Sequence, residues 1–126
     1  MYIPWDEREY VGINYLLGKT LKEIVNDYDE LEFITTEDEK VLMFHDQDCC
    51  ESVYIEDING DLDDLIGEPI LMAEEITEQG DVEWGTYTWT FYKIATIKGT
   101  VVIRWNGESN GYYSESVDVI IRKRKD

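Results

Sequence analysis

Short runs of alternating hydrophobic and polar residues follow one another from about residue 20 onward. A period of two places alternate side chains on opposite faces of a strand, so each run predicts a β-strand. The runs are rich in β-branched and aromatic residues, which strands favour. The predicted strands cover residues 21–25, 31–35, 41–45, 52–58, 70–76, 86–97, 100–105 and 112–121.

The pattern before residue 20 is different and predicts a helix. Apolar residues recur between Tyr10 and Leu17 without the strict alternation of the later runs. Asp6 is a suitable N-cap with Glu9 three residues later, and Gly18 is a suitable C-cap. We therefore expect a helix over about residues 6–17.

Turn-forming residues separate the strands and introduce a second, short helix. Residues 59–61, with the sequence NGD, predict a turn into a helix near residues 61–66, which Gly67 ends. The pair Asn106–Gly107 is a hairpin signal. The expected fold is α+β: a mostly antiparallel sheet of about six to eight strands over residues 20–121, with an N-terminal helix and a short second helix.

The composition fits a single domain spanning residues 1–126. A chain of 126 residues with 43% hydrophobic and 13% aromatic content can build one core, and this content argues against disorder. No run of about 18 apolar residues is long enough to cross a membrane. The N-terminus lacks the features of a secretory signal, so we expect a cytoplasmic protein with a basic tail at residues 122–126.

Acidic residues are concentrated in one half of the chain. Residues 23–83 contain 22 Asp or Glu and one basic residue, Lys40, for a local net charge of -21. Residues 1–22 are neutral and residues 84–126 carry +3, which together give the chain's -18. A surface this dense in carboxylates repels nucleic acid and attracts proteins with cationic surfaces. The alternative is an acidic, soluble protein with no such partner.

The acids predicted to contact a cationic partner lie at expected turns and helix starts. Exposed charges are screened within about 8 Å at physiological ionic strength, so binding through them should weaken as salt increases. The predicted contact residues are Asp27, Asp29, Glu30, Glu37, Asp38, Glu39, Asp61, Asp63 and Asp64.

Residues 45–51 contain the only histidine and both cysteines of the chain. Imidazole and thiolate are ligands of tetrahedral zinc, and a carboxylate from Asp48, Glu51 or the Glu74–Glu75 pair can complete the shell. The alternative is that these are ordinary packed residues. Because neighbouring cysteines rarely bridge each other, we expect reduced thiols. The predicted ligands of a structural zinc ion are His45, Asp48, Cys49 and Cys50.

The sequence favours a binding protein over an enzyme, and we predict no catalytic residues. A thiolate nucleophile at Cys49 or Cys50 is disfavoured because the surrounding carboxylates repel a further negative charge. The sequence lacks the phosphate-loop, dinucleotide-binding and HExxH motifs. The aromatic residues between Trp84 and Tyr113 favour cross-strand packing, since a platform for stacked bases sits in a positive groove.

Several blocks of the sequence resemble a family of small proteins carried by bacteriophages and prophages. The most specific block is HDQDCCESVYIEDI at residues 45–58, followed by GDL at 60–62 and LIGEPIL at 65–71. Further blocks are TWTFY at 88–92, WNG at 105–107 and GYYS at 111–114, and the resemblance covers roughly residues 17–120. Family members often have Cys at the position of Asn59, so a third thiol near the predicted metal site is missing here.

Some proteins of this kind are similar to phage anti-CRISPR proteins that act on the type II effector Cas9. The resemblance implies a zinc-binding Cas9 inhibitor in the cytoplasm of an infected or lysogenic bacterial host. Cas9 holds nucleic acid in positively charged channels, so an acidic face acting as a DNA mimic would hinder nucleic-acid engagement. This protein would bind no nucleic acid itself.

Two alternatives remain open at this point. The first is a phage protein that sequesters a nucleotide signal, with phosphates bound by Lys93, Lys98, Arg104 and the basic tail. The second is a small metal-dependent enzyme centred on His45, which would need an open coordination position.

Overall fold

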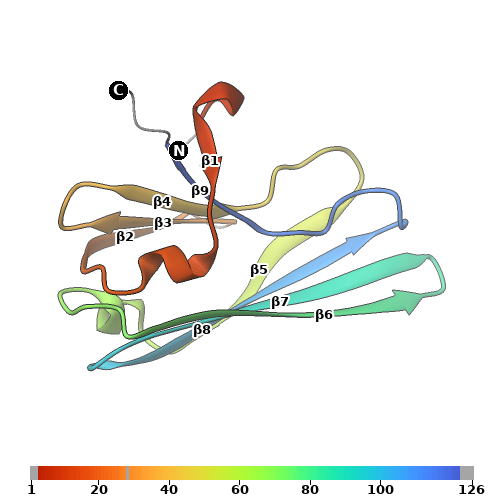
Figure 1. Ribbon diagram of the computed structural model, residues 1–126. Helices are drawn as coiled ribbons and strands as arrows, with labels where there is room; N and C mark the ends of the chain where they lie inside the picture. The colour runs from red at the N-terminus through yellow and green to blue at the C-terminus, as the bar shows by residue number, and fades with distance from the viewer. Residues whose placement is uncertain (1–2, 28, 123–126) are drawn as a thin grey trace.

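The computed structural model describes residues 3–27 and 29–122, which form two antiparallel β-sheets stacked as layers (Figure 1). The five-stranded sheet has the order β1 (Arg8–Tyr10), β9 (Asp118–Arg122), β4 (Lys40–Phe44), β3 (Glu30–Thr35) and β2 (Leu21–Asp27). The four-stranded sheet has the order β5 (Ser52–Asn59), β8 (Gly99–Ser109), β7 (Gly85–Thr96) and β6 (Met72–Val82). The molecule is therefore an antiparallel β-sandwich.

Side chains from the facing surfaces of both sheets form one hydrophobic core. On β8, the alternating residues Val101, Ile103 and Trp105 point inward and are fully buried. The indole Nε1–H of Trp105 donates to Sδ of Met43 on β4, with an N···S distance of 3.3 Å. Full burial of a large apolar side chain contributes about 1.5–3 kcal/mol, so this row holds the two layers together.

The N-terminal segment corrects the prediction of a helix over residues 6–17. It contains two 3-10 turns, η1 (Trp5–Glu7) and η2 (Ile13–Leu16), separated by β1. Residues 8–10 pair with β9, and a backbone committed to a strand ladder cannot also make helical hydrogen bonds. Of the apolar residues between Tyr10 and Leu17, Ile13 and Leu16 of η2 are buried, whereas Tyr10 and Leu17 are about half exposed. The apolar pattern therefore does not mark one face of a continuous helix.

The predicted helix caps have mixed outcomes. The residue that precedes η1 is Pro4, and no side chain caps this turn, so Asp6 is not an N-cap. Gly18 follows η2 with φ of +79°, the left-handed conformation expected of a glycine after a helical turn.

The second predicted helix, near residues 61–66, is the single 3-10 turn η3 (Leu62–Leu65). The carboxylate of Asp61 accepts a hydrogen bond of 3.0 Å from the backbone N–H of Asp63, so the predicted turn start is present. A β-bridge between Leu21 and Ile66 then stops further winding. No helix in the described ranges exceeds four residues, and the predicted α+β class is wrong: the fold is β-rich with two sheets.

Two further strand predictions need correction. Asn106–Gly107 does not form a hairpin, because β8 continues to Ser109 between β5 and β7. The strand predicted over residues 112–121 is shortened to β9, and the described residues contain nine strands rather than about six to eight. Of the basic tail, Arg122 lies in β9 and residues 123–126 lie outside the described part of the chain.

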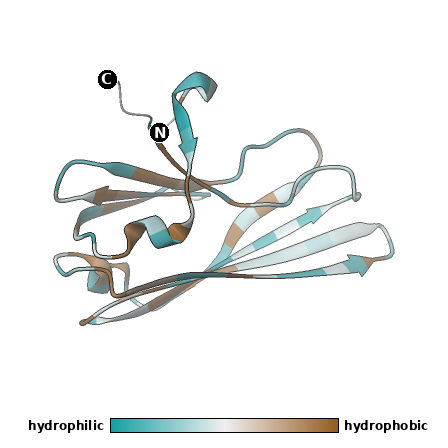
Figure 2. Cartoon of the chain, viewed as in Figure 1, coloured by the Kyte–Doolittle hydropathy of each residue, from teal (hydrophilic) through white to brown (hydrophobic). Residues whose placement is uncertain are grey.

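The hairpin of β6 and β7 reaches beyond the five-stranded sheet at the right of Figure 1. Figure 2 shows that this outer half of the hairpin is pale to teal, whereas brown hydrophobic segments gather where the two layers overlap. The inward pairs here are Thr77 with Thr90 and Gln79 with Thr88 instead of apolar residues. The sandwich therefore ends in a polar opening.

In the described ranges, no helix has the length and apolar character needed to cross a membrane.

Candidate functional site: a loop junction, an acidic edge and a polar groove

His45 joins the loop that follows β4 to the loop that precedes β9. Its Nδ1 lies 2.7 Å from the carbonyl oxygen of Ser116, and its Nε2 lies 3.3 Å from a carboxylate oxygen of Glu51. A carbonyl oxygen only accepts, so Nδ1 must carry a proton for the first bond. An ionised carboxylate also only accepts, so both bonds form together only when the imidazole is doubly protonated.

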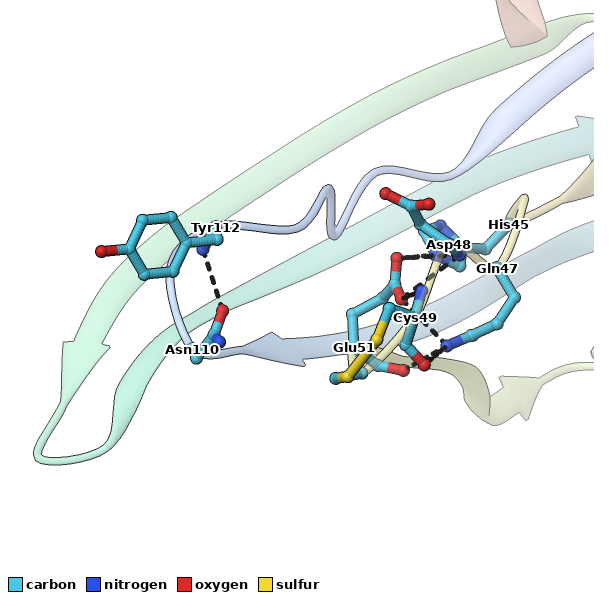
Figure 3. Close-up of a disulfide and its surroundings, with 8 residues drawn as sticks. His45, Gln47, Asp48, Cys49, Glu51, Asn110 and Tyr112 are labelled. Atoms are coloured by element: carbon cyan, nitrogen blue, oxygen red, sulfur yellow. Dashed lines mark hydrogen bonds and ion pairs between the residues drawn. A yellow bond between two sulfur atoms is a disulfide. The ribbon is translucent and has the colours of Figure 1, made fainter.

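Glu51 is buried and organises the 45–51 loop around its carboxylate (Figure 3). It accepts hydrogen bonds from Nε2 of Gln47 at 2.9 Å and from the backbone N–H of Cys49 at 2.8 Å, with a further bond from the N–H of Asp48. Burial acts to raise the pKa of Glu51, but hydrogen bonds from the backbone N–H groups of Cys49, Glu51 and Asp48 and from the His45 side chain outweigh it, so the pKa is lowered. The carboxylate is thus held in its charged form.

The predicted zinc ligands do not converge on a metal site in this structure. Both ring nitrogens of His45 have hydrogen-bond partners, and Asp48 is exposed to solvent. Cys49 and Cys50, at a bend, are joined in a disulfide, whereas the sequence analysis expects thiols. In residues 3–27 and 29–122, no group of three or more His, Cys, Asp or Glu side chains is placed to hold a metal ion.

Zinc at this loop therefore stays a prediction with two requirements. One ring nitrogen of His45 must leave its present partner, and the Cys49–Cys50 bond must be reduced so that thiolates can bind. Of the alternative carboxylates, Glu51 is already enclosed by donors, and Glu75 accepts a hydrogen bond of 2.9 Å from the Tyr92 hydroxyl.

β2 is an edge strand of the five-stranded sheet and β5 is an edge strand of the four-stranded sheet, and both lie along one side of the molecule. Asn26 of β2 and residues 55–58 of β5 line the same shallow depression, which places the two edges next to each other. Exposed carboxylates follow both edges and continue into the adjoining turns. We call this surface the acidic edge and define it by Glu23, Asp27, Asp29, Glu37, Asp38, Glu56, Asp57, Asp61 and Asp63.

The structure separates the predicted partner contacts into exposed and partly buried residues. Asp27, Asp29, Glu37, Asp38, Asp61 and Asp63 are exposed, whereas Glu30, Glu39 and Asp64 are partly buried.

The predicted contacts also fall at opposite ends of β3. Asp27 and Asp29 flank the β2–β3 turn, and the 37–38 pair lies in the β3–β4 turn. This second turn adjoins η3, because the N–H of Thr36 donates to Thr20 and the N–H of Gly67 donates to Leu21.

Sequence reasoning missed the residues that connect these two groups. Glu23 on β2 and Glu56 and Asp57 on β5 lie between them along the edges. Alternation alone does not say which strand ends a sheet, so the sequence carries no signal for an edge position.

Few cations neutralise the acidic edge. Asp38 pairs with Lys22, whose hydrogen bond and charge lower the pKa of Asp38, and Glu56 pairs with Arg104 at 2.9 Å. Among the described residues, no ion pair involves the remaining exposed acids on the strand edges and η3, namely Glu23, Asp27, Asp57, Asp61 and Asp63. The acidic edge therefore keeps a net negative charge that is available to a cationic partner.

Sequence reasoning also missed a polar groove of about 570 Å³ between the β6–β7 hairpin and residues 113–117. Buried Glu115 lies in its wall and accepts hydrogen bonds from the hydroxyl groups of Thr86, Thr88 and Ser109. Burial acts to raise the pKa of Glu115, but the three hydroxyl donors outweigh it and the pKa is lowered. The only sequence signal is the threonine at every second position of residues 86–90.

These features define a small antiparallel β-sandwich with an acidic edge and a polar groove. The family described as Domain of unknown function (DUF7448) matches residues 14–119, and the chain belongs to this family. No curated protein matches the chain, and no solved structure matches it.

Proposed function

We propose that this protein binds a cationic nucleic-acid-binding protein through the acidic edge and competes there with nucleic acid. The observation that carries the proposal is the alignment of β2 and β5 along one side, with exposed carboxylates on both strands and few cations among them. Strands hold these carboxylates on a rigid frame, so little conformational entropy is lost when a partner binds.

Duplex DNA presents one negative charge per roughly 1.7 Å of its axis, and proteins that bind it offer a dense array of Lys and Arg. The carboxylates of the acidic edge can pair with these Lys and Arg side chains in place of the phosphates of DNA. Complementary fields raise the association rate most strongly at low ionic strength. Edge strands also carry charges to prevent pairing with other chains. If the charges only protect the edge strands in this way, the protein has no cationic partner. The binding test below distinguishes this protective role from the proposal.

The specific partner that we propose is a type II Cas9 effector in the cytoplasm of a bacterial host. Support comes from the resemblance of residues 45–58 to phage proteins, some of which are similar to anti-CRISPR proteins. Further support comes from the positively charged channels in which Cas9 holds guide and target strands. In this proposal the protein is an inhibitor, not an enzyme.

Binding to a purified Cas9–guide complex, measured by interferometry at several salt concentrations, tests the proposal. The test variant combines Asp27→Asn, Asp57→Asn, Asp61→Asn and Asp63→Asn. A matched control removes the same charge elsewhere, with Glu74→Gln, Glu78→Gln, Glu83→Gln and Glu108→Gln, four exposed residues outside the acidic edge.

We expect salt-sensitive binding that the test variant loses and the control keeps. Equal loss in both variants would mean that net charge alone matters, and binding that survives in the test variant would exclude the acidic edge as the interface. Absence of any binding to Cas9, followed by salt-eluted capture of no other basic protein, would leave the acidic edge with only its protective role.

The two alternative functions have less support from the geometry. A phosphate ligand needs gathered cations, but Arg104 already pairs with Glu56 and lies over the Trp89 ring at 5.4 Å. A metal-dependent enzyme needs an open position at His45, whose two ring nitrogens are both engaged. The structural zinc ion remains part of the proposal on the chemistry of its donors, under the two requirements given above.

A further inference from the structure

The carboxylate of Glu115 is a buried negative charge that pairs with no cation in the described part of the chain. The residue is 9% exposed, and among the described residues it takes part in no ion pair. Buried charges in proteins are normally paired with an opposite charge or bound to a metal. Three hydroxyl groups orient this carboxylate, but hydroxyl groups are neutral and leave its charge uncompensated.

Glu115 also keeps capacity for another donor. An ionised carboxylate offers about four lone-pair positions, and the hydroxyls of Thr86, Thr88 and Ser109 occupy three of them. The N–H of Gly111 donates to the hydroxyl of Ser109 at 3.0 Å, which fixes that donor in place. The site is thus preorganised around a charge that one further hydrogen bond would complete.

All the charged residues that line the groove of Glu115 are acidic. Glu75 and Asp81 on β6 contribute two more carboxylates, and none of the described residues in its wall is Lys or Arg. Phosphates and other anions are therefore repelled. Most of the remaining wall is made of hydroxyl and amide groups and two tyrosines, including Thr77, Gln79, Thr90, Tyr87, Tyr113 and Ser114. Such a lining offers acceptors for N–H donors and ring surfaces for a cation.

We propose that this groove binds a primary ammonium or guanidinium group. The group is carried either by a Lys or Arg side chain of a partner protein or by a free polyamine. It would donate to Glu115 and Asp81 while its aliphatic stem lies against Tyr113 and Val117, which line the same groove. The groove is built from the β6–β7 hairpin and residues 113–117, so the proposal does not depend on the acidic edge of β2 and β5.

Titrations followed by NMR of the full-length protein test this assignment. The probes are spermidine, a blocked peptide with one lysine, the same peptide with norleucine in its place, and magnesium chloride. The key variant is Asp81→Asn, because Asp81 is exposed and its change leaves the Glu115 network intact. Its control is Glu78→Gln, on the opposite face of the same strand and outside the groove. Glu115→Gln is the second variant.

We expect shifts at residues 113–117 with spermidine, the lysine peptide or both, and none with norleucine. The probe that binds identifies the source of the cationic group. Asp81→Asn should weaken binding at least tenfold, the loss of about 1.4 kcal/mol that a removed charge partner readily causes, and Glu78→Gln should not.

Equal weakening by both variants, binding of magnesium alone, or no binding at all would overturn the assignment. The four-site variant of the acidic edge should still bind spermidine. Retained groove binding with lost Cas9 binding therefore tells the two proposals apart.

Discussion

The buried guanidinium of Arg8 forms an ion pair with the partly exposed carboxylate of Asp46, with Nη1 and Oδ2 3.2 Å apart. Arg8 also donates from Nε to the carbonyl oxygen of Ile3 at 2.7 Å and lies over the ring of Trp5 at 4.2 Å. One side chain thus ties the N-terminal strand to the start of the 45–51 loop.

We expect Arg8→Met to destabilise the protein by roughly 1–3 kcal/mol, because it removes a buried hydrogen bond and leaves a partly buried carboxylate without its cation. Urea unfolding followed by tryptophan fluorescence measures the change. Arg104→Met is the matched control, since Arg104 and Glu56 are a more exposed pair whose loss should cost about 1 kcal/mol or less. Similar losses in the two variants would contradict the structural role of Arg8.

Acid should destabilise the protein through Glu51 and Glu115. Both have a folded-state pKa below the ordinary value of 4.5, so each stabilises the folded state fully above about pH 4.5. This contribution is lost as the pH falls below 4.5 through the lower folded-state values. Asp118 has a pKa raised chiefly by burial and acts in the opposite sense, since its protonation favours the folded state.

Denaturant unfolding at a series of pH values between neutral pH and about pH 3 measures this acid dependence. Glu51→Gln should unfold more easily at neutral pH and lose less stability on acidification than the unaltered protein. Glu37→Gln, at an exposed turn outside the 45–51 loop, is the control for the removal of one negative charge. An unchanged slope in Glu51→Gln would show that this carboxylate is not held as described.

His45→Ala should loosen the junction between the two loops. It removes two hydrogen bonds, each worth roughly 1 kcal/mol net, so we expect a loss of about 2 kcal/mol in the free energy of unfolding. Amide hydrogen exchange should rise at residues 46–51 and 114–118, the segments that His45 joins. Faster exchange spread evenly over the strands would indicate a global effect and contradict a local clamp.

Zinc should bind the reduced protein but not the protein with the Cys49–Cys50 disulfide, because the metal takes thiolates as ligands. Metal analysis after dialysis, with and without a reductant, measures this difference. Binding should raise the melting temperature, and His45→Ala should abolish it. Reduced protein that retains no zinc would remove the predicted metal site and leave the loop to the Glu51 network alone.

Local sequence pattern accounts for most of the strands. The alternation over residues 31–35, 41–45 and 52–58 corresponds closely to β3, β4 and β5, since a period of two is a property of the strand itself. The same local reasoning failed at residues 6–17, where the ladder between β1 and β9 displaces the helix. It failed again at Asn106–Gly107, where pairing on both sides keeps β8 extended.

The candidate sites divide along the same line. Composition and charge are additive along the chain, so the acidic half and the unusual segment 45–51 are visible without a structure. The partners that give these residues their roles are distant in sequence: Ser116 lies 71 residues from His45, and Thr88 lies 27 residues from Glu115. Such contacts exist only after strands from both ends of the chain have paired, because a carboxylate or imidazole acquires its environment from whatever the fold packs around it.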